Sequence, residues 1–346
     1  MLDDRNVLKQ RDPEGTLGLI ANLYQALVWQ PKIENPEHDE RPLTRIIVAG
    51  MGGSALAAEI IRPIAFREFS LPFEIVKGYE LPEYVDDQTL VFLVSHSGNT
   101  EETLDCYRQA RERGSQLAVV TAGGALAEFA GRDGVVHVIV PSGAQPRMSI
   151  FHHLRAQLKL LEHFGITGST YSQELTEASE WLREESVGWH PEVPVQDNYA
   201  KQLALVAVGK TPVIYGGPLT APFAYKWKIS WNENAKNVAF CNQYPEFNHN
   251  EFIGWSSHPV EKPFVIFDLR SHLERPRIAE RMELSDRLLS GLRPKAHVVE
   301  LKGETYWQQA VWACTLADAT SCYVAILGGV NPAPVELVER FKKELS

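Results

Sequence analysis

The sequence has few cysteines and no long run of apolar residues. Its four cysteines, at positions 106, 241, 314 and 322, form no CxxC pair and no disulfide-framework spacing. We therefore expect free thiols, as in a reducing cytoplasm, and no structural zinc site. No apolar run approaches the roughly 20 residues that cross a membrane, and residues 1–6 do not resemble a signal peptide. The sequence thus favours a cytoplasmic protein without a membrane partner.

The chain also lacks a basic face. Its formal net charge is −10, whereas a surface that binds nucleic acid needs clustered Lys and Arg to meet the phosphates. The densest basic run, at residues 108–113, is typical of a solvated helix end. The histidines are scattered except for His152 and His153, which would point in different directions on a helix. We therefore expect neither a nucleic-acid partner nor a metal site.

What the chain does contain is an alternation of strand-length apolar runs with helical patterns. Such an alternation is typical of βαβ units and predicts an α/β fold with parallel sheets. In the first half, helices are expected to begin near Ser54, Thr100 and Ala125. The predicted strands are residues 45–49, 73–77, 90–94, 117–121, 135–140, 213–215, 238–241, 264–268 and 297–301.

The length of 346 residues exceeds what one hydrophobic core usually serves, so two domains are expected. We predict two doubly wound domains flanked by helices, at residues 1–165 and 199–346. A helix and a linker at residues 166–198 would join them. Other expected helices are residues 17–29, 148–164, 306–327 and 334–345, the last two packing across the domains or against another subunit.

A glycine-rich loop, Gly50-Met-Gly-Gly-Ser-Ala55, follows the first of these strands and opens a helix. Glycines let the backbone approach a ligand, and free N–H groups at a helix start favour an anion. The glycine spacing also satisfies a loose dinucleotide fingerprint, so a nicotinamide site is an alternative. It ranks second, because Gly78 and Tyr79 follow the next strand where a ribose-binding acid would be expected.

A second loop, Ser95-His-Ser-Gly-Asn-Thr100, follows another apolar strand. Loops at the carboxyl ends of parallel strands converge, so hydroxyls and N–H groups from both loops could bind a phosphate monoester. Alternatively, Ser97 or Asn99 is a turn residue and Thr100 is an N-cap, which is compatible with phosphate binding. The hydroxyls concerned are those of Ser54, Ser95, Ser97 and Thr100.

Two polar clusters, residues 232–236 and 248–255, contain a carboxylate and an imidazole suited to proton transfer. Glu233 follows an amphipathic stretch and is expected near a helix C-terminus, where the dipole disfavours negative charge. That makes it a candidate base, although spacing alone favours a solvated acid at a helix end. Asn248 and Glu251 are predicted to form a capping box.

Residues 95–103 resemble the phosphosugar-binding signature of the sugar isomerase (SIS) domain. Residues 145–147, 225–236 and 245–255 resemble the bifunctional phosphoglucose/phosphomannose isomerase family, with matching segments from residue 45 to the turn Gly329-Val-Asn-Pro332. The resemblance implies two SIS domains and a metal-independent, cofactor-free aldose-ketose isomerase. Its substrates would be fructose 6-phosphate, glucose 6-phosphate and mannose 6-phosphate.

The resemblance also implies a role for each site residue. Glu233 would move a proton between C1 and C2, His249 would open the sugar ring, and Arg147 would stabilise the enediolate rather than form a surface ion pair. Residues implied to bind substrate are Gly52, Gly53, Ser54, Ser95, Ser97, Thr100, Thr320 and Ser321. For the last two, ordinary helix packing is an equal alternative. A homodimer in which His249 reaches the neighbouring site is implied as well.

The chain departs from the family pattern at two places. His96 stands where an aromatic residue is usual, and no basic residue occurs near Gly328. Possible substitutes for that basic residue are Lys226, Lys228 and Lys236. Trp231 and Trp255 are predicted to pack in the interior rather than to stack on substrate.

Other functions stay open. A non-catalytic sugar-phosphate sensor would not need the Glu233 and His249 clusters, and a glucosamine-forming SIS enzyme would need an N-terminal cysteine where Leu2 stands. Another SIS sugar-phosphate isomerase or a dehydrogenase are the remaining alternatives.

Overall fold

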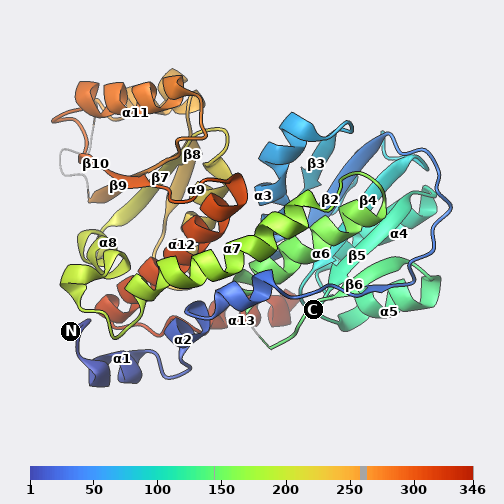
Figure 1. Cartoon of the computed structure of the whole chain (residues 1–346), viewed down its shortest axis with the longest axis horizontal. Helices are drawn as coiled ribbons and strands as arrows, with labels where there is room; N and C mark the ends of the chain where they lie inside the picture. Colours follow the sequence, from blue (N-terminus) through green and yellow to red (C-terminus); the bar gives the residue numbers. More distant parts are fainter. Residues whose placement is uncertain (144, 258–262, 346) are drawn as a thin grey trace. The chain divides into compact units, whose positions relative to one another are not determined.

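The computed structural model describes residues 1–143, 145–257 and 263–345, which fold into two compact units. We call residues Tyr24–Ser179 the six-strand unit, and Met1–Leu23 together with Glu180–Ser346 the four-strand unit. Each contains one sheet with helices packed against it (Figure 1). The predicted α/β class with largely parallel sheets is therefore confirmed.

The sheet of the six-strand unit has the order β1-β6-β5-β4-β2-β3, and all its pairs are parallel except β1 with β6. Its central strands are nearly continuous runs of buried apolar residues, as expected for a sheet covered on both faces. The strands are β1 Ile33–Glu34, β2 Arg45–Gly50, β3 Phe73–Val76, β4 Thr89–Ser95, β5 Gln116–Thr121 and β6 Val136–Ile139.

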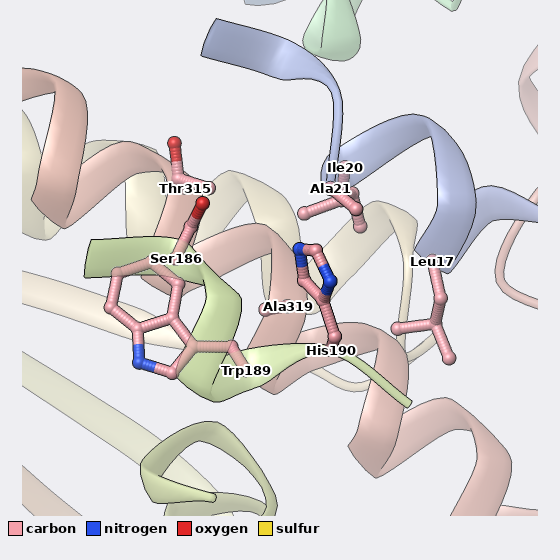
Figure 2. Close-up of a pocket in the computed structure, with 8 residues that line it drawn as sticks. All are labelled: Leu17, Ile20, Ala21, Ser186, Trp189, His190, Thr315 and Ala319. Atoms are coloured by element: carbon pink, nitrogen blue, oxygen red, sulfur yellow. The ribbon is translucent and has the colours of Figure 1, made fainter. Parts of the chain in front are cut away.

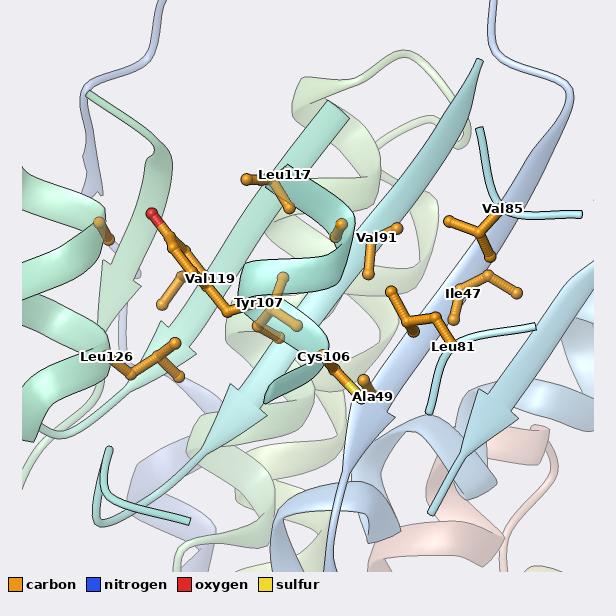
Figure 3. Packing of buried hydrophobic residues seen from close by; sticks show 13 residues of the cluster. Ile47, Ala49, Leu81, Val85, Val91, Cys106, Tyr107, Leu117, Val119 and Leu126 are labelled. Carbon is orange, nitrogen blue, oxygen red and sulfur yellow. The ribbon is translucent and has the colours of Figure 1, made fainter. Parts of the chain in front are cut away.

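Helices cover this sheet and complete its core. Figure 3 shows Cys106 and Tyr107 from one helix packed over Ile47 and Val91 of the strands, with Leu126 from the next helix beside them. The helices of the unit are α3 Gly52–Glu68, α4 Glu101–Glu112, α5 Gly124–Asp133, α6 Ile150–His163 and the first part of α7 Thr170–Ser186. Four of them, α3 to α6, begin within two residues of the predicted starts.

The sheet of the four-strand unit has the order β10-β9-β7-β8 and is parallel throughout. Its strands are β7 Thr211–Gly216, β8 Phe240–Gln243, β9 Phe264–Arg270 and β10 Ala296–Glu300. Its α-helices after α7 are α8 Tyr199–Ala207, α9 Ala221–Glu233, α10 Glu251–Gly254, α11 Pro276–Leu288, α12 Tyr306–Gly328 and α13 Glu336–Leu345. The four strands predicted for the second half are thus confirmed.

The prediction of a single helix at residues 17–29 is wrong. The structure has α1 Arg5–Arg11, the short helix α2 Thr16–Ile20 and the 3₁₀ helix η1 Leu23–Leu27. Helix α2 ends because the Asn22 side chain donates to the Gly18 carbonyl at 2.8 Å, in competition with the backbone bond that would extend the helix.

The expectation that no segment approaches membrane length needs correction for α12. This helix is long and apolar enough to cross a membrane by length and composition, with a mean hydropathy of 1.5 over its most apolar 18 residues. However, 94% of that window is buried inside the protein. Burial of this kind is typical of a core helix.

Candidate active site

The two hydroxyl-bearing loops of the six-strand unit lie against each other. One joins β2 to α3 and the other joins β4 to α4, and β2 pairs with β4 in parallel. Their strands therefore end at the same edge of the sheet. The His96 N–H donates to Ser54 Oγ at 2.9 Å, which links the second loop directly to the first.

Within the second loop, the hydroxyls of Ser97 and Thr100 lie close to that of Ser95. Its Oγ lies 2.8 Å from Thr100 Oγ1 and 3.5 Å from Ser97 Oγ, and it accepts from the Gly98 N–H at 3.1 Å. Thr100 is the N-cap residue of α4, as predicted, but its side chain makes no capping bond. Its hydroxyl instead faces the serine cluster, at a helix start whose N–H groups favour an anion.

Glycine at position 53 allows a third segment to reach this edge of the sheet. A Cβ there would lie 3.2 Å from the Arg147 nitrogen and 3.2 Å from the Pro146 carbonyl carbon. Arg147 lies in the 3₁₀ turn η2 Pro146–Met148 and is 1% exposed. Its alternative role in a surface ion pair is therefore wrong, because the side chain is not at the surface.

In the four-strand unit, α9 ends at Glu233, as the sequence predicts. The chain leaves the helix through Lys236, which has a left-handed φ of 52°. The Lys236 ammonium donates to the Glu233 carbonyl at 2.7 Å and to the Pro332 carbonyl at 2.9 Å. A positive charge thus lies at the carbonyl end of α9, where the helix dipole favours it.

Thr320 and Ser321 lie on α12, and both are fully buried. Ser321 Oγ accepts from the Asn234 side chain at 2.9 Å, so this part of α12 contacts the residue that follows Glu233. The Thr320 hydroxyl has no hydrogen-bond partner among the described residues. An unpaired buried hydroxyl is uncommon and calls for a reason beyond packing.

His249 is exposed at the end of the 3₁₀ turn η5 Glu246–His249. The turn is anchored by Phe247, which is fully buried against Tyr215 at a ring separation of 4.6 Å. Asn248 is held from the other side, since its Nδ2 donates to Ser285 Oγ at 2.8 Å. The exposed imidazole of His249 therefore lies on a turn that is fixed by the packing of Phe247 and the hydrogen bond of Asn248.

The capping box predicted for Asn248 and Glu251 is wrong. Asn250 is the N-cap of α10, and its side chain accepts from the Glu251 N–H at 2.6 Å. The Glu251 carboxylate accepts instead from the Tyr215 hydroxyl and, at 2.7 Å, from Asn242 Nδ2. The Asn248 side chain bonds Ser285 instead, and the cap lies two residues later, at Asn250.

The predicted packing roles of Trp231 and Trp255 are confirmed. Trp231 is fully buried, with its ring 5.7 Å from each of the rings of Trp227 and Phe267. Trp255 is 8% exposed and meets Phe264 edge-on at 5.4 Å.

Sequence reasoning missed Arg11. Its Nη1 donates to the Ile326 carbonyl near the end of α12, and a Cβ on Gly329 would lie 3.9 Å from its guanidinium. A cavity of about 320 Å³ lies here, lined by Arg11, Gly329 and Asn331 among others. No local signal could reveal this cation, because it is 315 residues away in the chain from its acceptor.

A second cavity of the four-strand unit is too small for a sugar phosphate. The pocket in Figure 2, between Leu17, His190 and Thr315, has a volume of about 10 Å³, which is enough for one water molecule. Among the described residues, no group of three or more His, Cys, Asp or Glu side chains could hold a metal ion.

Comparison with known proteins assigns both halves of the chain. Residues 41–167 match the SIS domain, and residues 196–345 match the bacterial phospho-glucose isomerase C-terminal SIS domain. The bifunctional phosphoglucose/phosphomannose isomerase of Aquifex aeolicus is 33% identical over 328 residues, covering 94% of this chain and 97% of that protein.

A second relative has a different activity. The D-glucosamine-6-phosphate 4-epimerase of Sulfolobus acidocaldarius is 32% identical over 261 residues, covering 71% of this chain and 77% of that protein. Among solved structures, a glucose-6-phosphate isomerase like protein from Thermus thermophilus aligns with a TM-score of 0.66 and 21% identity. The alignment covers 99% of this chain and 98% of that one, and it shows the same fold.

Proposed function

Because this chain belongs to the bifunctional phosphoglucose/phosphomannose isomerase family, it is a sugar-phosphate isomerase, and we propose that Glu233, His249 and Arg147 carry its chemistry. The reaction interconverts fructose 6-phosphate with glucose 6-phosphate and mannose 6-phosphate through an enediol. The observation that best supports this site is the cluster of four hydroxyls at two loops linked by the His96–Ser54 hydrogen bond.

The sugar phosphate is held by the two loops. The hydroxyls of Ser54, Ser95, Ser97 and Thr100, together with N–H groups at the starts of α3 and α4, donate to the phosphate oxygens. Gly52 leaves room for the phosphate beside its backbone, and Gly53 lets the backbone of Arg147 come close to the same loop. Since the phosphate does not react, its binding supplies energy for positioning the carbons that do.

Proton transfer is the task of Glu233. The proton at C2 is weakly acidic, so the base needs a fixed position beside the carbon and a positive charge near the developing enediolate. Arg147 provides that charge. Of the three candidate lysines for the missing basic side chain, Lys236 is the best supported, because its ammonium contacts both the carbonyl of Glu233 and the turn at Pro332.

His249 opens the cyclic sugar by exchanging protons with the ring and anomeric oxygens, a role suited to imidazole near neutral pH. Its exposure supports a homodimer in which it reaches the partner's site. Thr320 lines the pocket in which the enediol turns about C2–C3, so that either face of C2 can accept a proton. Its unpaired buried hydroxyl supports this role.

The test is to mix purified protein with fructose 6-phosphate in the presence of a metal chelator and to identify the products. Formation of both glucose 6-phosphate and mannose 6-phosphate supports the proposal. Activity lost to the chelator and restored by zinc would contradict the metal-independent mechanism. Binding of fructose 6-phosphate without turnover would instead support a sensor.

A 4-epimerase is the second candidate, because one relative at 32% identity has that activity. Glucosamine 6-phosphate should be supplied in a parallel reaction. A 4-epimer formed faster than the aldose products would favour this candidate over the isomerase.

A further inference from the structure

The contact between α9 and α12 in the four-strand unit is polar at its centre. Lys226, Ser230 and Asn234 are spaced four residues apart, which places them on one side of α9 and its C-terminal end. Asp318 and Ser321 face them from α12. All five residues are fully buried, although helix contacts inside a protein are usually apolar.

Hydrogen bonds connect these side chains without a break. The Lys226 ammonium donates to Asp318 Oδ1 and, at 2.9 Å, to Ser230 Oγ. Ser230 Oγ donates to the same carboxylate oxygen at 2.8 Å. One turn later, Asn234 Nδ2 donates to Ser321 Oγ at 2.9 Å and lies 3.5 Å from Asp318 Oδ1.

Fold stability does not account for this arrangement. Two charges buried together lose their hydration, and an apolar pair of similar volume is often as stable or more stable. The second carboxylate oxygen, Asp318 Oδ2, is buried with no hydrogen-bond partner among the described residues. Hydrogen bonds are directional, however. They fix the rotation of one helix and its position along the other more strictly than apolar contacts do.

We propose that Lys226 and Asp318 are positioning residues for the base Glu233. The network includes Asn234, which directly follows Glu233, and Ser230, one turn before it. It therefore fixes the last turn of α9, and a base displaced by about 1 Å can lose a factor of 10² in rate. This inference rests on the proposed function and gives Lys226 a role inside the fold rather than at the sugar oxygens.

The test variant replaces the ion pair by apolar side chains, Lys226→Met together with Asp318→Leu. The double variant should unfold at a temperature close to that of the wild type. With fructose 6-phosphate, kcat should fall about 10- to 100-fold while KM changes less than about 3-fold. Exchange of the C1 proton of fructose 6-phosphate with deuterated solvent should fall by the same factor as kcat, because both report on Glu233.

Lys201→Met is the matched control. Lys201 is also fully buried in the four-strand unit, where its ammonium lies 3.0 Å from Asp3 Oδ1 and donates to the carbonyls of Pro191 and Val193. These three acceptors lie outside α9 and its network. Loss of the Lys201 ammonium should lower the unfolding temperature and leave kcat unchanged at temperatures where the variant is folded.

If the double variant does not fold, Ser230→Ala tests the positioning role, because it removes only one hydroxyl from the network. It should lower kcat about 3- to 10-fold at unchanged KM. Wild-type kcat in either network variant, or an equal loss in Lys201→Met, would overturn the inference while leaving an active wild-type enzyme. Absence of turnover in the wild type would contradict the proposed function itself and, with it, the inference.

Discussion

His96 Nδ1 and His153 Nε2 lie 3.1 Å apart, so the residue between Ser95 and Ser97 is hydrogen-bonded to a histidine inside α6. His153 is fully buried. Burial, together with the neighbouring His96 and His152, lowers the pKa of His153 to about 3. His153 is therefore neutral, and its hydrogen bond to His96 anchors the loop to α6.

This pair predicts an acid-sensitive fold. The pKa of His153 is about 3 in the folded chain and near 6.5 when unfolded, so between these values only the unfolded chain binds the proton. The free energy of unfolding is therefore unaffected by the titration of His153 above about pH 6.5. It falls by up to about 1.4 kcal/mol per pH unit as the pH drops toward 3. His153→Phe should flatten that slope in urea unfolding measured at pH 7 and 4.5.

The control for the pH experiment is His38→Gln, which changes a histidine of the same unit that keeps partial access to solvent. It should leave the acid slope as in the wild type. If His153→Phe and the wild type lose the same free energy of unfolding between the two pH values, His153 does not carry the effect.

Glu233→Gln keeps the shape of the side chain and removes the carboxylate proposed as the base. Product formation and solvent deuterium exchange at the carbon next to the carbonyl should fall together, by about 10²- to 10⁴-fold. Substrate KM should change little. Exchange at the wild-type rate in this variant would mean that another residue is the base.

His249→Ala separates ring opening from proton transfer. With cyclic substrate, turnover should be poor, because the closed sugar cannot present its carbonyl. With an open-chain phosphosugar that cannot form a ring, proton exchange by Glu233 should persist. Equal losses for the two substrates would show that ring opening is not the distinct role of His249.

Ser97→Ala should raise KM for the phosphorylated sugar about 10-fold, with a smaller change in kcat, because a charge-assisted hydrogen bond to a non-reacting group is lost. Ser54→Ala should act in the same direction, but it also removes the acceptor of the His96 N–H. Ser115→Ala is the control. Ser115 lies just before β5 begins, outside both loops, and its hydroxyl donates to the Asp86 carbonyl. An unchanged KM in both loop variants would place the phosphate elsewhere.

Gly98→Ala should destabilise the six-strand unit. Gly98 has a φ of 69°, and a Cβ there would lie 1.8 Å from the Gly123 carbonyl oxygen. Strain and collision together should cost about 3 kcal/mol in the free energy of unfolding. At Gly131 in α5, an added Cβ has no atom within 4 Å. Gly131→Ala should therefore raise the free energy of unfolding by up to about 1 kcal/mol. Similar urea midpoints for the two variants would argue against the tight crossing at Gly98.

Strands could be predicted where both faces of the sheet are covered. β4 and β5 are runs of buried apolar residues whose limits are visible in the sequence. The two-residue strand β1 could not be found this way, because it exists only through antiparallel pairing of Ile33 with Val138. The predicted helix at residues 17–29 failed for a related reason, since the Asn22 side chain competes with the backbone for the Gly18 carbonyl.

The sequence by itself determined the residue types of the site and the elements that carry them. Glycine and serine at strand ends, and a carboxylate at the end of α9, are local features that follow from short-range backbone chemistry. Only the tertiary structure decided which groups meet. The Lys226–Asp318 pair and the Arg11 guanidinium beside Gly329 join residues far apart in the chain. Such contacts depend on how whole helices pack, which no local pattern encodes.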